Sequence, residues 1–207
     1  MKNKTETIFV IDDDESVRRS LSLFLKATKY DVEAYSSSEE YLARESYDGI
    51  GCLILDVNLG GKTGLELQEE LKTNGSHLPI IFITGIGDIH MSVAALKNGA
   101  INFLEKPFKD EELLQSISEA LAISKKIKAE NDELKNARSL IDALTLRENE
   151  VLKYLLTGML NKQIGDELKI AEHTVKLHRI SICEKLGVKS VAEIIHIAAK
   201  AGVYPYK

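Results

Sequence analysis

Three aspartates in the first half of the chain stand where apolar segments end. Asp12 and Asp13 follow the segment TIFVI, and Asp56 closes the segment GCLILD. If these segments are neighbouring parallel strands, the three carboxylates meet at one edge of the sheet and repel one another. A cluster made only of oxygen ligands favours Mg²⁺ or Mn²⁺ over zinc, so we expect a hard divalent cation. An aspartate bound to such a cation can also act as a phosphoryl acceptor.

Further residues at strand ends extend this pattern towards phosphate chemistry. Thr84 ends the segment PIIFIT and offers a hydroxyl group, and Gly85 lets its backbone N–H approach a ligand closely. Lys106 follows INFLE and supplies positive charge for phosphoryl oxygens. The Lys106–Pro107 bond is a candidate cis peptide that would fix the direction of the lysine. Each feature alone is common, but together they predict a phosphoacceptor site.

Alternating apolar strands and amphipathic helices must position these residues. Five β–α units in succession predict an α/β fold, a doubly wound five-stranded parallel sheet of the flavodoxin-like type. The expected strands are 7–11, 31–35, 51–56, 79–84 and 101–105, and the expected helices are 15–27, 36–44, 65–73, 89–98 and one from about 110.

The bulk composition fits a two-domain protein without a membrane anchor. The chain has 207 residues, of which 44% are hydrophobic and 29% charged. No apolar run reaches the length of a membrane span, and the N-terminus soon meets acidic residues, so we expect no signal peptide, no membrane partner and a cytoplasmic location. Cys52 and Cys183 are expected to be structural thiols.

Charge is unevenly distributed along the chain. Residues 142–207 carry ten Lys/Arg against eight Asp/Glu, whereas residues 1–141 carry 17 against 24. An acidic first part and a mildly basic last part suggest separate roles. We expect a phosphoacceptor domain at 1–122, a helical linker at 123–143 and a small all-α domain at 144–207.

The segment 110–144 contains no Gly or Pro and predicts a long helix. Apolar residues recur every seven positions, at Leu113, Ala120, Ile127, Leu134 and Ile141, and a second seam holds Ile123, Ala137 and Leu144. The pattern fits a coiled coil with a second copy of the chain. It also fits an amphipathic terminal helix followed by a solvated charged linker, and both interpretations remain open at this point.

From residue 145 the pattern is that of short helices joined by tight turns. Thr145 and Glu148 form a capping box, and Gly158 marks the end of that first helix. The further expected helices are 161–168, 172–186 and 191–201. This arrangement is typical of a helix-turn-helix. The helix 172–186 would bury Val175, Ile182 and Leu186.

The opposite face of helix 172–186 is basic and suits docking into the major groove of DNA. Lys176 could reach a base edge, most often guanine, and Ile180 could touch a thymine methyl, with Leu177 as a further base-contacting candidate. Phosphate contacts are expected from Thr174, Arg179, Lys162 and Lys189. The alternative is a protein-binding helical module with a solvated basic face.

The motifs VIDDDESVR, LILDVNLGGKTGLEL, IFITG and NFLEKPF closely resemble the receiver domain of response regulators, over about residues 5–125. The resemblance implies Asp56 as phosphoacceptor, Asp12 and Asp13 as Mg²⁺ ligands together with the carbonyl of Asn58, and Lys106 as phosphate partner. It also implies Thr84 and Phe103 as the switch pair. One departure is Gly60-Gly61, where the family usually has Pro-Gly, which should loosen the loop.

The segment 145–198, with TVKLH followed by KLGV, resembles the LuxR-type helix-turn-helix of the NarL/FixJ family. The combination implies a transcription regulator with a sensor histidine kinase, promoter DNA and RNA polymerase as partners, and homodimerisation on phosphorylation. It is not expected to be an enzyme, since it would catalyse only its own phosphorylation and dephosphorylation. There are two rival hypotheses. One is a phosphatase that uses Asp56 as its nucleophile in each turnover, and the other is a DNA-binding protein that is insensitive to phosphorylation.

Overall fold

The computed structural model describes residues 6–85 and 89–206. Two compact units can be separated, Met1–Lys128 and Ala129–Lys207, and each is described by itself. The elements in chain order are β1 (Thr7–Ile11), α1 (Glu15–Ala27), β2 (Asp31–Tyr35), α2 (Ser38–Leu42), β3 (Gly51–Asp56), α3 (Gly64–Thr73), β4 (Ile80–Thr84), α4 (Ile89–Lys97), β5 (Asn102–Glu105), α5 (Asp110–Asp142), α6 (Leu146–Leu155), α7 (Asn161–Leu168), α8 (Glu172–Leu186) and α9 (Val191–Ala201).

The first unit is built on a five-stranded parallel sheet in the order β2-β1-β3-β4-β5. This order confirms the predicted flavodoxin-like fold class. The chain reverses its direction of winding between β2 and β3, so the carboxyl ends of β1 and β3 flank the switch point of the sheet. Open parallel sheets bind their ligands at this point.

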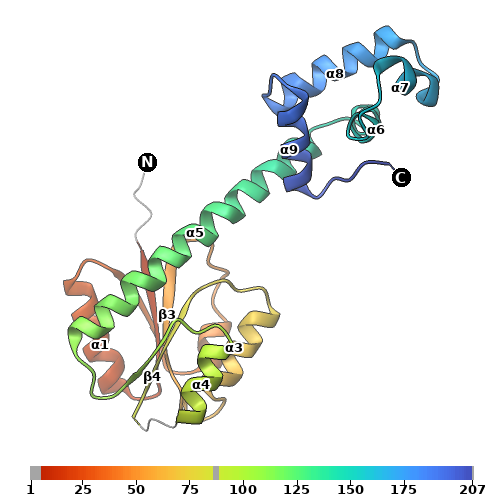
Figure 1. The fold of residues 1–207 in the computed structure, drawn as a ribbon. Coiled ribbons are helices and arrows are strands. Elements are labelled where there is room, and N and C mark those ends of the chain that lie inside the picture. Colours follow the sequence, from red (N-terminus) through yellow and green to blue (C-terminus); the bar gives the residue numbers. More distant parts are fainter. Residues whose placement is uncertain (1–5, 86–88, 207) are drawn as a thin grey trace. The chain divides into compact units, whose positions relative to one another are not determined.

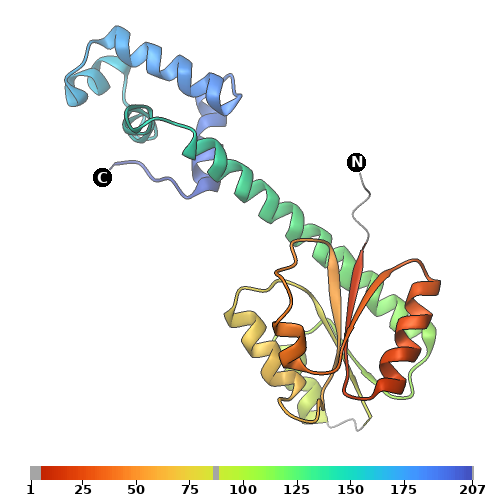
Figure 2. The ribbon, with the colours of Figure 1, turned by 180° about the vertical axis from the view of Figure 1, so that it is seen from behind.

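Helices cover both faces of the sheet, with α1 and α5 on one face and α2, α3 and α4 on the other (Figures 1 and 2). Alternate residues of each strand enter the two cores, as the twofold side-chain period of a strand requires. On β3, for example, Ile54 packs towards α1 and α5, and Leu53 packs towards α2 and α3. Both side chains are fully buried, which confirms GCLILD as a central strand covered on both faces.

Local capping explains where several helices begin. Asp14 caps α1 by accepting hydrogen bonds from the backbone of Ser16 and Val17. Of the three serines considered for α2, Ser37 is the cap. Helix α2 ends at Leu42, slightly before the expected Arg44, a difference within the usual uncertainty of helix ends.

Helix α5 is continuous over 33 residues, so the predicted long helix is confirmed. Its heptad series, however, does not form one exposed seam. Leu113 and Ala120 are buried against the sheet, whereas Ile141 is buried in the core of the second unit. Between these buried positions, the first seam leaves only two residues that could contact a second copy of the chain. They are Ile127, which is half-buried, and Leu134, which is 39% exposed. Most residues of the heptad series are therefore buried in the two cores, so the series gives little support to a coiled coil.

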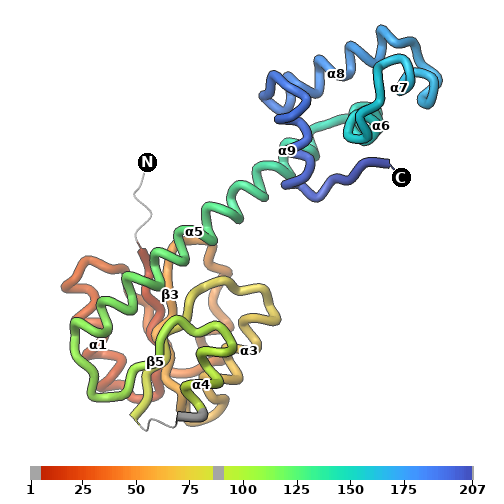
Figure 3. The backbone as a smooth tube through the Cα atoms, viewed as in Figure 1, coloured from red at the N-terminus to blue at the C-terminus, as the bar shows by residue number. Residues whose placement is uncertain are grey.

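The second unit contains α6 to α9, whose connections Figure 3 traces. The predicted burial of Val175, Ile182 and Leu186 on α8 is confirmed. The Thr145–Glu148 capping box of α6 is also present. Helix α6 ends at Leu155, before the expected stop at Gly158, because a hydrogen-bonded turn fills the intervening positions.

No helix in 6–85 and 89–206 is long and apolar enough to cross a bilayer. Residues 1–5 lie outside the described residues. They begin the N-terminal segment, for which we expect no targeting role.

Candidate functional site

The carboxyl ends of β1 and β3 bring Asp12, Asp13 and Asp56 together. One carboxylate oxygen from each residue lies within 4.8 Å of those of the other two. Asp12 and Asp56 are buried and Asp13 is exposed, so the cluster has two carboxylates below the surface and one at its mouth. The meeting of these three side chains, expected from the ends of strands in sequence, is confirmed.

Lys106 reaches the cluster from the end of β5. Its Nζ lies 2.6 Å from Oδ2 of Asp12 and 3.5 Å from Oδ2 of Asp56. The bond between Lys106 and Pro107 is cis, as the sequence suggested. The backbone N–H of Lys106 donates to the carbonyl of Thr84 at 2.7 Å, which ties the lysine to the end of β4.

The electrostatics of Asp56 reflect this crowded setting. Burial raises the pKa of Asp56 above its usual value, Lys106 opposes the rise, and the negative charge of Asp12 adds to it. The Oδ1 of Asp56 is buried and accepts no hydrogen bond from any residue that the structure describes. A buried carboxylate oxygen without a donor is costly, unless another ligand binds it.

The loop after β3 passes close to Asp56 because it contains glycine. A Cβ at Gly64 would lie 2.3 Å from the carbonyl oxygen of Asp56 and 3.1 Å from the ring of Phe82. Only a residue without a side chain allows this approach. Asn58, two residues beyond Asp56, is exposed at the beginning of the same loop.

The two residues expected to form a switch lie on neighbouring strands. Thr84 is fully buried at the end of β4, and Phe103 is half-buried on β5. The ring of Phe103 packs on Phe82, with 6.2 Å between the ring centres. Phe82 and Phe103 are register partners of the β4–β5 ladder.

Two neighbours of Asp12 were not identified from the sequence. The backbone N–H of Asp14 donates to Oδ1 of Asp12 at 2.9 Å, and the guanidinium group of Arg18 donates to the carbonyl of Asp12 at 2.7 Å. These contacts fix the loop that carries Asp12. The run of three aspartates was the available signal for Asp14, whereas nothing in the pattern singled out Arg18.

In the second unit, α8 presents most of the predicted DNA-contacting residues. Lys176, Leu177 and Ile180 are exposed, and Thr174 and Arg179 are half-buried. Lys176, Arg179 and Ile180 line a shallow groove of about 590 Å³, which also includes Lys189 and Val191. Lys162 is exposed on α7 and is not part of that lining.

Side-chain hydrogen bonds fix α8 to α6 and α7. Arg179 donates a hydrogen bond of 2.6 Å to Oδ1 of Asn161, the first residue of α7. Glu148 on α6 is buried and accepts from Lys185 at 2.7 Å and from Ser181 at 2.6 Å. Sequence reasoning assigned Glu148 only to the capping box, because its partners on α8 are more than 30 residues away.

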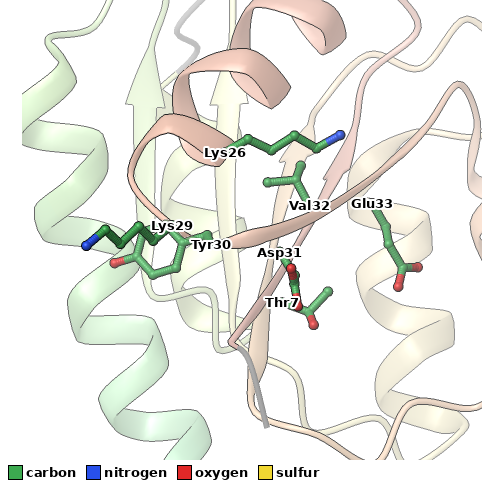
Figure 4. A pocket seen from close by; sticks show the side chains of 7 residues that line it. All are labelled: Thr7, Lys26, Lys29, Tyr30, Asp31, Val32 and Glu33. Carbon is green, nitrogen blue, oxygen red and sulfur yellow. The ribbon is translucent and has the colours of Figure 1, made fainter. Parts of the chain in front are cut away.

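A separate hollow of about 570 Å³ lies near the amino ends of β1 and β2. Its lining includes Lys26, Lys29, Tyr30 and Glu33. The amino groups of Lys26 and Lys29 point in opposite directions, as Figure 4 shows. The hollow therefore does not gather its charged groups around a common ligand.

Comparison with known proteins gives each unit a family. Residues 8–118 match the response regulator receiver domain, and residues 142–198 match the luxR family of bacterial regulatory proteins. Nodulation protein W of Bradyrhizobium diazoefficiens is 41% identical over 95% of this chain and 86% of the relative. Transcriptional regulatory protein FixJ of Rhizobium meliloti is 33% identical over 96% of this chain and 98% of the relative.

Solved structures show the same relationship. The response regulator StyR has a TM-score of 0.84 and 41% identity, covering 95% of this chain and 99% of that one. Full-length FixJ from B. japonicum has a TM-score of 0.55 and 32% identity, covering 95% and 97%. The chain belongs to the NarL/FixJ family of two-component response regulators, with a receiver domain followed by a LuxR-type DNA-binding domain.

Proposed function

We propose that this response regulator carries a signal from a sensor histidine kinase to promoter DNA, and that Asp56 is its phosphoacceptor. The observation that carries the proposal is the buried Oδ1 of Asp56, which has no hydrogen-bond donor among the described residues and stands beside Asp12, Asp13 and Lys106. Such an oxygen is available to form a new bond.

The acidic cluster fits a small divalent cation. Its oxygen-only donor set and the mutual repulsion of three carboxylates favour Mg²⁺ or Mn²⁺. We assign Asp12, Asp13, Asp56 and the backbone carbonyl of Asn58 as its ligands. When bound, the cation neutralises charge on the transferring phosphoryl group.

The residues of the chain promote the transfer by holding the reacting groups in place. An oxygen of Asp56 attacks the phosphorus of a phosphohistidine, the new O–P bond forms as the N–P bond breaks, and the histidine nitrogen keeps the electron pair. Lys106, which is 3.5 Å from Oδ2 of Asp56, binds an oxygen of the transferred group. Later, water attacks the same phosphorus, the O–P bond to Asp56 breaks, and the carboxylate keeps the electron pair as inorganic phosphate leaves. The protein thus catalyses only its own phosphorylation and dephosphorylation.

Phosphorylation would be transmitted through Thr84 and Phe103. The hydroxyl of Thr84, at the end of β4, turns towards the new phosphoryl group, and the space it leaves lets the half-buried ring of Phe103 swing inwards. The change on the β5 side promotes homodimerisation, either through the receiver or through α5. The dimer then binds its promoter and acts with RNA polymerase.

We propose that α8 enters the major groove of DNA. The exposed Lys176 reaches a base edge, and Leu177 and Ile180 are exposed by 52% and 47%, which leaves them free to contact thymine methyl groups. Phosphates are bound by Thr174, Arg179, Lys162 and Lys189.

Labelling with acetyl phosphate in the presence of Mg²⁺ tests the phosphoacceptor. We expect Asp56→Asn to abolish the phosphorylated species on a phosphate-affinity gel, because the attacking oxygen loses its charge. Asp31→Asn is the matched control, since Asp31 is exposed at the amino end of β2, at the edge of the sheet opposite to Asp12 and Asp56. Undiminished labelling of Asp56→Asn would refute the assignment.

A further inference from the structure

We propose that Gly60 is a positioning residue for the divalent cation, because its missing side chain leaves the space that the Asp13 carboxylate occupies. This inference rests on the proposed cation site and adds a residue that is not itself a ligand. It also gives a role to Gly60, which stands where the family usually has the proline of a Pro-Gly pair.

The backbone at Gly60 has a conformation that proline cannot adopt. Its φ is +65°, in the left-handed region. The ring of proline fixes φ near −65°, and most residues with a Cβ enter the left-handed region only with strain. The loop after β3 therefore follows a path that depends on glycine at this position.

The close neighbour of Gly60 is a proposed metal ligand. A Cβ built on Gly60 would lie 3.2 Å from Oδ2 of Asp13 and 4.0 Å from its Cγ. At that separation the side chain of Asp13 has to move by a few tenths of an ångström, and it can do so because it is exposed. A side chain at position 60 would thus act on the metal site through Asp13.

Such a displacement matters for a small cation. The oxygens of Asp12, Asp13 and Asp56 already lie within 4.8 Å of one another. Mg²⁺ requires near-ideal octahedral geometry and short bonds, so it tolerates little movement of a ligand. Residues that orient metal ligands typically change affinity by about 10- to 100-fold when they are mutated.

Gly61 provides the matched control within the same loop. A Cβ at Gly61 would meet no atom within 4 Å, and its backbone is not in the left-handed region. Gly61→Ala therefore adds the same methyl group one residue away without crowding Asp13.

The test is a calorimetric Mg²⁺ titration of the full-length protein without a phosphodonor, with thermal unfolding in the absence of Mg²⁺ as a check of folding. We expect Gly60→Ala to weaken Mg²⁺ binding by about tenfold, at the lower end of the effect of residues beside metal ligands. Gly61→Ala should bind like the wild type. If Gly60→Ala does not fold, Gly60→Asn carries the same Cβ in a residue that tolerates the left-handed conformation.

A double-mutant cycle with Asp13→Ala decides whether Gly60 acts through Asp13. We expect Gly60→Ala to cause no further loss when Asp13 is absent. Equal losses in both backgrounds, or wild-type affinity in Gly60→Ala, would overturn the inference. Failure of the wild type itself to bind Mg²⁺ would instead refute the proposed cation site, so the two hypotheses fail differently.

Discussion

The ammonium group of Lys106 lies 2.6 Å from Oδ2 of Asp12, a carboxylate that is fully buried. The same ammonium is farther, at 3.5 Å, from Oδ2 of Asp56. Lys106 therefore supplies positive charge to a cluster whose carboxylates repel one another. A divalent cation would bind oxygens of the same cluster, so removal of Lys106 should destabilise the metal-free form and strengthen cation binding.

We expect Lys106→Ala to lower the free energy of unfolding of the receiver without Mg²⁺ by about 2 kcal/mol, because the buried Oδ2 of Asp12 loses the donor from Lys106. Added Mg²⁺ should then stabilise the variant more than it stabilises the wild type. Thermal unfolding across a Mg²⁺ series measures both effects. Lys109→Ala, at an exposed position, is the control. Identical Mg²⁺ dependence in Lys106→Ala and wild type would contradict this account.

The buried Glu148 predicts a pH dependence in the second unit. Burial opposes its charge, but donors from Lys185, Ser181 and Thr145 outweigh that effect and lower the pKa of Glu148 from 4.5 to about 2. Because the folded-state pKa is the lower one, the stabilisation is fully present above about pH 4.5 and is lost as the pH falls towards 2. The shift corresponds to about 3 kcal/mol.

Glu148→Gln should therefore be less stable at neutral pH and should lose less stability than the wild type on acidification to pH 2. Urea titrations of the full chain, followed by NMR signals from α6 to α9, measure the difference directly. Glu184→Gln, on the exposed side of α8, controls for the loss of one carboxylate. The interpretation fails if wild type and Glu148→Gln lose stability in parallel.

The acidic pocket could be predicted because the strand order and the residues at the strand ends determine which carboxylates meet. Parallel neighbouring strands place Asp12 and Asp56 at the same edge, whatever the loops do. The burial of Val175 and Ile182 could be predicted for a similar reason, since both follow from the period of a single helix.

Features that depend on distant partners or on one backbone angle could not be predicted. Ala120 and Ile127 are one heptad apart and look equivalent in sequence, yet only Ala120 is buried against the sheet. Apolar spacing does not say whether a helix packs on a sheet, in a bundle or on a second copy. In the same way, the left-handed φ of Gly60 and the Arg179–Asn161 hydrogen bond have no local sequence signal that specifies them.

The contact between Arg179 and Asn161 leads to the last prediction, which concerns DNA reading. Arg179 is half-buried and held by Asn161 at 2.6 Å, whereas Lys176 is exposed on the same helix. A held guanidinium group suits one fixed phosphate, and a free lysine suits a base edge in the groove. The two residues should therefore differ in what their loss changes.

We expect Lys176→Ala to relax the preference at one position of the half-site at a cost of about 1–3 kcal/mol. Arg179→Ala should weaken binding to all sequences about equally and reduce the salt slope by about one. Asn161→Ala should also weaken binding uniformly but keep the salt slope, because the charge of Arg179 remains. Selection from random oligonucleotides, with binding measured at several matched salt concentrations, separates these outcomes.

Adding Asn161→Ala to Arg179→Ala should have no further effect on binding, since Asn161 acts through the arginine. A changed sequence preference in Arg179→Ala, with none in Lys176→Ala, would reverse the two roles. Unaltered binding in both would mean that α8 does not lie in the groove.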